Sequence, residues 1–128
     1  MSLHSEILEQ PQRLADLLKN QRATVEAVAR EVKKRDVNYV MLAARGTSDN
    51  AGRYANYLLG SFNQLAVALA APSLFTYYQT PPRLRNALVI GISQSGQSPD
   101  IISVLEEGRK QSCLTLAITN IPASPITS

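Results

Sequence analysis

Residues 86–98, Asn-Ala-Leu-Val-Ile-Gly-Ile-Ser-Gln-Ser-Gly-Gln-Ser, decide the fold of this chain. The first seven are nearly all apolar, which predicts a strand buried on both faces of a parallel sheet. The residues that follow are small and polar and include Gly96, as is typical of a turn. A helix is predicted next, over residues 99–111, because Ser98 stands at the N-cap position and Pro99 at the first helical position.

The same alternation of strand and helix patterns runs along the whole chain. Runs rich in apolar and β-branched residues predict further strands at residues 37–43, 64–70 and 114–119. Apolar spacing predicts helices at residues 5–20, 22–35 and 50–62 and a short helix at 72–78. Pro11 would mark a kink or a helix start. Because strands separated by helices need crossover connections, the sequence predicts an α/β fold, a three-layer αβα sandwich around a parallel sheet.

Composition restricts the class of protein. The chain has 128 residues, 45% of them apolar and 18% charged, which predicts a folded domain. A net charge of +3, spread along the chain, argues against a nucleic-acid partner. No apolar run approaches the roughly 20 residues of a membrane-spanning helix, so no membrane partner is expected. Cys113 is the only cysteine, which excludes an intrachain disulfide and fits a reducing, cytoplasmic location.

The loop after the strand at 86–92 is the first candidate site. In open α/β sheets, ligands bind beyond the carboxyl ends of the strands. Ser93, Ser95 and Ser98 surround Gly96 there, at a helix N-terminus whose free amide groups and dipole attract an anion. Three hydroxyls could each donate a hydrogen bond to a phosphate. The alternative is that Ser98 only caps the helix and that the other serines only shape the turn.

The loop after the first strand carries a second group of hydroxyls. Thr47 and Ser48 lie in it, and either could instead cap the following helix. A doubly wound sheet places this loop beside the serine loop, so together they would enclose a small phosphorylated ligand. The spacing of Gly46 and Gly52 does not match a nucleotide phosphate loop. Carboxylates are better interpreted as structural or solvated: Asp49 as a helix cap, and Asp100, Glu106 and Glu107 as a solvated helix face.

These two loops resemble the phosphosugar-binding loops of the sugar isomerase (SIS) domain family. The matching motifs are Gly46-Thr47-Ser48 and Ser93-Gln94-Ser95-Gly96, supported by Glu-Ile-Leu-Glu-Gln-Pro at residues 6–11 and Ile-Thr-Asn at 118–120. The likeness is strongest to the isomerase part of glucosamine-6-phosphate synthase and to stand-alone phosphosugar isomerases and deaminases. It implies a flavodoxin-like sheet with strand order 2-1-3-4, helices at residues 1–35, and a first SIS domain at 36–128 that stops before its fifth strand.

The resemblance also implies roles for individual residues. The expected phosphate-binding residues are Ser93, Gln94, Ser95, Gly96, Ser98 and Thr47, and the expected sugar-binding residues are Gly46 and Ser48. Three positions depart from the synthase pattern, with Arg45 replacing Cys, Gln97 replacing Glu and Ser98 replacing Thr. Ser98 keeps the hydroxyl, whereas Arg45 and Gln97 favour a stand-alone isomerase or deaminase branch.

Two functional hypotheses follow from the resemblance. In the first, the chain is the N-terminal piece of an amino-sugar-phosphate isomerase, deaminase or glutamine-fructose-6-phosphate aminotransferase-like protein, whose catalytic residues lie elsewhere. In the second, it is a non-catalytic phosphosugar-sensing module. Both predict a hexose phosphate or amino-sugar phosphate ligand, no metal, no cofactor and no catalytic residue in this chain. A homodimer or larger assembly is also expected, because the strand at 114–119 would be an open sheet edge.

Overall fold

The computed structural model describes residues 2–127 and divides into two compact units, one ending at Lys34 and the other beginning at Arg35. The first unit consists of helices α1 (Leu3–Asn20) and α2 (Arg22–Lys34). Helix α1 begins upstream of the predicted start because the hydroxyl of Ser2 accepts a hydrogen bond from the Ser5 amide at 3.2 Å and caps the helix. Pro11 lies inside α1, so its interpretation as a helix start is wrong.

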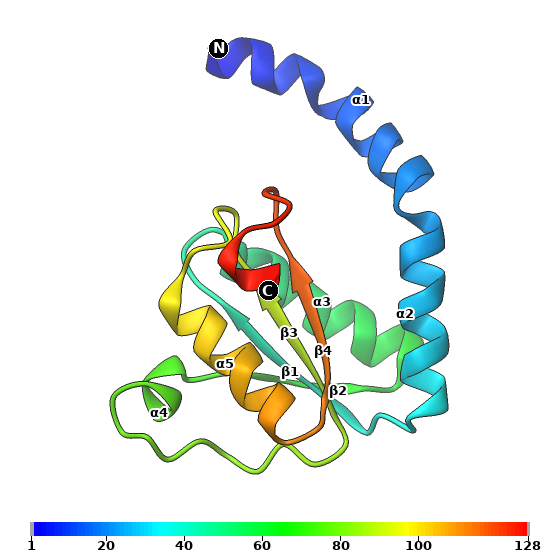
Figure 1. Ribbon diagram of the computed structural model, residues 1–128. Coiled ribbons are helices and arrows are strands. Elements are labelled where there is room, and N and C mark those ends of the chain that lie inside the picture. The colour runs from blue at the N-terminus through cyan, green and yellow to red at the C-terminus, as the bar shows by residue number, and fades with distance from the viewer. Residues whose placement is uncertain (1, 128) are drawn as a thin grey trace. The chain divides into compact units, whose positions relative to one another are not determined.

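The second unit alternates strands and helices along the chain (Figure 1). Its elements are β1 (Tyr39–Ala44), α3 (Ser48–Asn63), β2 (Ala66–Leu69), α4 (Pro72–Phe75), β3 (Ala87–Ile92), α5 (Pro99–Lys110), β4 (Leu114–Ile118) and a 3-10 turn, η1 (Pro125–Thr127). Helix α4 is shorter than the predicted 72–78 because the amides of Tyr77 and Tyr78 both donate to the Ser73 carbonyl and Gln79 adopts a left-handed backbone (φ 55°).

The four strands form one parallel sheet in the order β2-β1-β3-β4. This confirms the predicted α/β fold and strand order. In register, Ala43 of β1 pairs with Gly91 of β3, and Leu42 pairs with Ile90. Strands β2 and β4 form the two edges of the described sheet.

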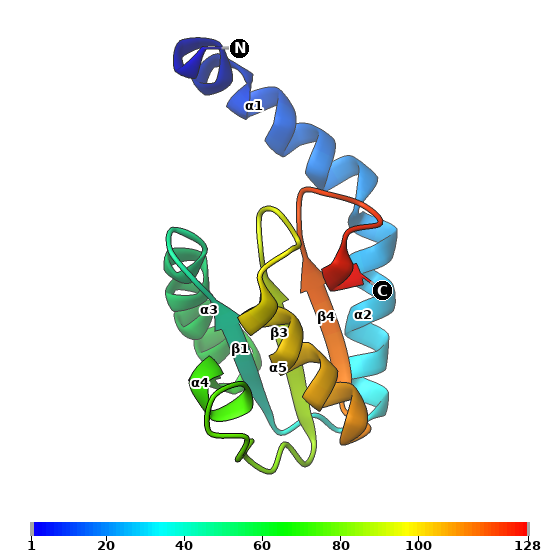
Figure 2. The ribbon, with the colours of Figure 1, turned by 60° about the vertical axis from the view of Figure 1, so that its left-hand side comes forward.

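Helices cover both faces of the sheet, α5 and α4 on one face and α3 on the other (Figure 2). Two glycines allow the close approach. A methyl group at Gly52 of α3 would lie 2.5 Å from a Leu42 methyl carbon, and one at Gly91 would lie 2.9 Å from Ile101 of α5. The neighbours Leu42 and Gly91 therefore belong to opposite faces, as the period-two geometry of strands requires.

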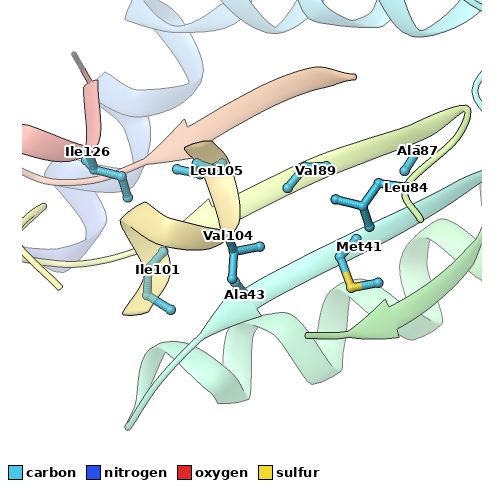
Figure 3. Packing of buried hydrophobic residues seen from close by; sticks show 9 residues of the cluster. All are labelled: Met41, Ala43, Leu84, Ala87, Val89, Ile101, Val104, Leu105 and Ile126. Atoms are coloured by element: carbon cyan, nitrogen blue, oxygen red, sulfur yellow. The ribbon is translucent and has the colours of Figure 1, made fainter. Parts of the chain in front are cut away.

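The main core lies between the sheet and α5 (Figure 3). Its members are buried apolar side chains, namely Met41, Ala43, Leu84, Ala87, Val89, Ile101, Val104, Leu105 and Ile126. Burial of each large aliphatic side chain is worth about 1.5–3 kcal/mol. This packing fixes the N-terminus of α5 above the carboxyl end of β3, where the candidate site lies. Among residues 2–127, no helix combines the length and apolar character needed to cross a membrane.

Candidate functional site

A pocket of about 400 Å³ opens at the carboxyl ends of β1, β3 and β4. It lies where three loops meet, and its walls are Arg45, Ser48, Ile92, Ser93, Gln94, Ser95, Ser98, Ile101, Asn120 and Ile121. Ile92, the buried Ile101 and the exposed Ile121 are its apolar components, whereas the other side chains carry hydrogen-bonding groups. The position agrees with the rule that ligands of open α/β sheets bind beyond the carboxyl ends of the strands.

The serine loop between β3 and α5 is folded by its own hydroxyl groups. The Ser93 Oγ accepts a hydrogen bond from the Gly96 amide at 3.1 Å, and the Ser95 Oγ accepts one from the Gln97 amide at 3.2 Å. Turn formation is therefore part of what these serines do. Each hydroxyl still has a proton to donate, so the turn geometry leaves Ser93 and Ser95 able to bind an anion.

Residues after β4 hold the serine loop in place by hydrogen bonds to its carbonyl groups. The Gln94 carbonyl accepts a hydrogen bond from the Thr119 hydroxyl at 3.3 Å, and the Gly96 carbonyl accepts one from the Ile126 amide at 2.9 Å. Gly96 has a left-handed backbone (φ 69°), and a methyl group there would lie only 2.0 Å from the Oγ of the buried Ser124. Only glycine therefore fits this position without rearrangement.

Helix α5 presents its N-terminus to the pocket. Ser98 occupies the N-cap position with an extended backbone, as predicted, but its side chain makes no capping hydrogen bond and lines the pocket instead. Capping through the side chain therefore does not account for Ser98. Within residues 2–127, the amide groups of Ser95 and Ser98 also have no acceptor. Free amides at a helix N-terminus are the groups that attract oxyanions.

An ion pair lies beside the pocket. Arg45, at the end of β1, contacts the carboxylate of Asp100 in the first turn of α5. Asp100, interpreted as part of a solvated helix face, is 30% exposed but also paired with Arg45, because α5 packing brings it to the loop after β1. Arg45 remains 66% exposed and lines the pocket, so it adds a positive charge beside the hydroxyl groups.

Five of the eight predicted site residues line this pocket, namely Ser48, Ser93, Gln94, Ser95 and Ser98. Gly96 does not line the pocket, but its left-handed backbone and its hydrogen bond with Ile126 hold the serine loop in place. Thr47 is exposed, stands at the N-cap position of α3 without a side-chain capping bond and does not line the pocket. Gly46 lines a neighbouring cavity of about 500 Å³ on the other side of Arg45.

Arg45 and Asn120 also line the pocket, although the sequence patterns predict no site role for either. Asn120 directly follows the predicted strand at 114–119, and Arg45 lies two residues after the predicted strand at 37–43, so their positions at strand ends were the available signal. Asp49, interpreted as a cap, lies in the first turn of α3 and pairs with Arg53 at 3.3 Å.

The pocket can bind an anion but carries few groups for proton transfer. Among the described residues, Arg45 is the only ionisable side chain in the lining, and a guanidinium cannot act as a base. Residues 2–127 contain no group of three His, Cys, Asp or Glu side chains arranged to hold a metal ion. The chemistry that this lining supports is the binding of a polar, negatively charged molecule.

Comparison with known proteins places this geometry in a family. The SIS domain pattern matches residues 31–128. A glutamine–fructose-6-phosphate aminotransferase (isomerizing) of Mycolicibacterium smegmatis is 33% identical over 126 residues, which cover 94% of this chain and 20% of that protein. A fructoselysine 6-phosphate deglycase of Escherichia coli K12 is 37% identical over 105 residues, which cover 81% of this chain and 31% of that protein.

A solved structure gives the same result. The crystal structure of a candidate phosphosugar isomerase from Silicibacter pomeroyi superposes with a TM-score of 0.92 at 36% identity, over 96% of this chain and 38% of that one. The chain thus spans between a fifth and a third of the curated relatives' length. The family match and these likenesses agree with the pocket at the strand ends, and the chain belongs to the SIS domain family.

Proposed function

We propose that this chain binds a hexose phosphate or an amino-sugar phosphate in the pocket formed by the loops after β1, β3 and β4. Ser93, Gln94, Ser95 and Ser98, with the backbone around Gly96, hold the phosphate. Ser48 contacts the sugar from the neighbouring loop, whereas Thr47 and Gly46, which lie outside the pocket lining, are assigned to the phosphate and to the sugar by the family resemblance alone.

One observation carries the proposal: neutral hydrogen-bond donors and one positive charge converge on the same small pocket. The hydroxyl groups of Ser93, Ser95 and Ser98 line it, the N-terminus of α5 opens onto it, and Arg45 borders it. A hydrogen bond to a charged ligand is worth about 1.5–3 kcal/mol, so a few such bonds suffice for selective binding. The partly buried Ile92 and the exposed Ile121 give the sugar ring an apolar surface to pack against.

The relatives support a role in amino-sugar-phosphate chemistry. Their names refer to fructose 6-phosphate and fructoselysine 6-phosphate, which are phosphorylated ketose derivatives. We infer that the protein is part of an amino-sugar-phosphate isomerase, deaminase or aminotransferase-like protein. Proton transfer between sugar carbons needs an acid or base within hydrogen-bond reach. The described lining offers only Arg45, so we expect the 128-residue chain alone to give no turnover of glucosamine 6-phosphate.

A non-catalytic phosphosugar-sensing module is the second candidate function. The observation that favours it is the same lack of a titratable acid or base in the described pocket lining. Both candidate functions predict that this chain alone gives no turnover in a coupled assay for fructose 6-phosphate formation from glucosamine 6-phosphate, so the assay tests whether the described residues lack catalysis. Turnover well above the buffer rate, lost in the Ser93→Ala variant, would contradict both and would show that the pocket contains a catalytic group.

Calorimetric titration with glucosamine 6-phosphate and with fructose 6-phosphate tests the binding proposal. The double variant Ser93→Ala/Ser95→Ala should bind at least about tenfold more weakly, because two donors to a charged ligand are removed. Ser61→Ala is the control, because its hydroxyl bonds only to the Tyr57 carbonyl of α3. Unchanged affinity of the double variant would assign both serines to turn formation alone.

Assembly and location follow from two further features. Strand β4 is an edge of the described sheet, and Ile118 on it is 49% exposed, so we propose that chains associate as a homodimer or larger oligomer. Sedimentation that shows only monomer at high concentration would contradict this.

The lone Cys113 suits a reducing compartment, and we propose that the protein is cytoplasmic, with no nucleic-acid or membrane partner.

A further inference from the structure

A second cavity, of about 460 Å³, lies at the opposite end of the sheet from the phosphosugar pocket. It opens where β3 and β4 begin, and residues just before β1, β3 and β4 form most of its walls. Arg83 and Arg85 come from the loop before β3, and Ser112 and Cys113 come from the turn before β4. Nothing in the proposed phosphosugar site uses this cavity.

The cavity is lined by positive charge. Arg83, Arg85 and Arg35 border it, and none of its lining residues carries a carboxylate. Within residues 2–127, neither Arg83 nor Arg85 lies within 4 Å of a carboxylate oxygen. The nearby Glu107 accepts a hydrogen bond from the Gln111 side chain at 3.0 Å. Two exposed guanidinium groups therefore have their full hydrogen-bonding capacity available.

The segment that carries both arginines is held in place by the residue between them. Leu84 is fully buried, so its neighbours on either side are turned toward the surface. Its amide donates to the Gln111 Oε1 at 2.7 Å, and its carbonyl accepts from the Cys113 thiol at 2.8 Å. These contacts fix the backbone from which Arg83 and Arg85 extend and reduce the entropy lost when both bind one ligand.

A second set of contacts holds the two flanks of this segment. The Gln111 Nε2 donates to the Pro82 carbonyl at 3.0 Å, and the Tyr39 hydroxyl donates to the Arg83 carbonyl at 3.4 Å. The end of α5 and the start of β1 therefore both position the arginine segment. An unstructured pair of surface arginines would lack such supports.

We propose that this cavity binds a small multivalent oxyanion, the phosphate of a phosphate ester or a cluster of carboxylates, between Arg83 and Arg85. Guanidinium groups match such oxyanions with paired N–H donors, and two of them on a fixed backbone can contact one multivalent ion together. The cavity is large enough for a small metabolite. The site is independent of the phosphosugar pocket and would persist if that pocket proved empty of function.

Residue-resolved nitrogen-15 NMR titration of the whole chain tests this proposal. The probes are inorganic phosphate, citrate and, as a monovalent comparison at equal ionic strength, acetate. We expect phosphate, citrate or both to cause saturable shifts in the amides of residues 84–87 and 112–114, and acetate to cause much smaller ones. Response to phosphate alone points to a phosphate ester, and response to citrate alone points to a polycarboxylate.

Charge variants make the test specific. Arg83→Ala and Arg85→Ala should each weaken the binding at least about tenfold, and Arg85→Lys should have an intermediate effect. Arg13→Ala, which removes an equal charge from α1, should leave the binding unchanged. The same spectra show whether each variant is folded, because its amide signals stay dispersed.

Several results would overturn the proposal. These are the absence of saturable shifts at residues 84–87 and 112–114, equal shifts with acetate, or unchanged affinity in a folded Arg85→Ala variant. The Ser93→Ala/Ser95→Ala variant separates the two sites, because it should lose phosphate-induced shifts at residues 93–98 and keep those at 84–87.

Discussion

The two ends of the sheet differ in how they offer hydrogen bonds to an anion. At the carboxyl end, hydroxyl and amide groups of the serine loop line the pocket, and Arg45 is the only charged residue in its described lining. At the amino end, the donors are the guanidinium groups of Arg83 and Arg85, on a segment that hydrogen bonds to Gln111 hold in place. Neutral donors depend on backbone geometry, whereas charged donors act over longer distances and weaken with salt. Backbone changes should therefore damage the first site, and charge changes should damage the second.

The largest effect is expected at Gly96. Gly96→Ala places a methyl group 2.0 Å from the Ser124 Oγ and 2.6 Å from its Cβ, at a backbone φ of 69°. We expect the free energy of unfolding to fall by roughly 2–4 kcal/mol, measured by urea denaturation, and glucosamine 6-phosphate binding to be lost.

Gly46→Ala is the matched control for this change. Gly46 also has a left-handed backbone, φ 62°, but a methyl group there meets nothing within 4 Å. Its cost should be only about 1–2 kcal/mol, from the backbone alone. Equal destabilisation by the two variants would mean that the contact with Ser124 does not matter.

Gln111 tests whether anion binding at the amino end depends on the hydrogen bonds that hold residues 82–84 in place. Gln111→Ala removes the acceptor of the Leu84 amide and the donor to the Pro82 carbonyl. We expect a loss of about 1–3 kcal/mol in unfolding free energy and weaker anion shifts at residues 84–87. Gln12→Ala, which removes only an exposed bond to Asp16, should cost less than about 0.5 kcal/mol. If Gln111→Ala bound oxyanions at 84–87 as tightly as the parent chain, these hydrogen bonds would not contribute to anion binding.

Arg45 tests how far the carboxyl end depends on charge. Arg45 is 66% exposed, so breaking its pair with Asp100 should change the unfolding free energy by less than about 0.5 kcal/mol. Arg45→Ala should weaken glucosamine 6-phosphate binding severalfold, less than the Ser93→Ala/Ser95→Ala variant does. Arg53→Ala is the control, because Arg53 is also paired and exposed but lies outside the pocket. If Arg45→Ala weakened glucosamine 6-phosphate binding more than the serine variant does, neutral hydrogen-bond donors would not be the main contribution at the carboxyl end.

The smallest effect concerns Cys113 at the amino end. Burial raises the pKa of the Cys113 thiol, against lowering contributions from the Ala87 backbone and Arg35. Folding therefore favours the protonated thiol. This contribution to stability is complete below the pKa of an unfolded thiol, about 8.5, and declines as the pH rises toward the higher folded pKa.

Alkylation rates and stability curves measure this effect. Iodoacetamide at pH 8 should react several times more slowly with the folded chain than with the urea-unfolded chain. The stability decrease between pH 8 and pH 10 should be smaller in Cys113→Ser. Equal rates for folded and unfolded chains would show that burial does not protect the thiol.

The elements of the fold were predictable because their signals are local. The apolar run at 86–92 and the alternation of patterns gave the parallel sheet, and the hydroxyl spacing at 93–98 located the main loop of the pocket. Contacts between distant residues were not predictable. Arg45 and Asp100 lie 55 residues apart, and only the packing of α5 on the sheet brings them together.

The direction of individual side chains was also not predictable from the sequence. Ser98 occupies the predicted N-cap position, but a composition pattern does not specify whether its hydroxyl turns to the helix amides or to the pocket. Thr47, which the same reasoning grouped with the site, stays outside the pocket lining.

Mapping glucosamine 6-phosphate on the nitrogen-15 NMR spectrum of the whole chain tests the central claim most directly. If the serine loop binds the phosphate, saturable shifts should appear at residues 94–98 and at Ser48, and should disappear in the Ser93→Ala/Ser95→Ala variant while those of Ser61→Ala match the parent chain. Saturable shifts confined to residues 83–87 and 112–114, with none at 94–98, would place the ligand at the other end of the sheet and contradict the account.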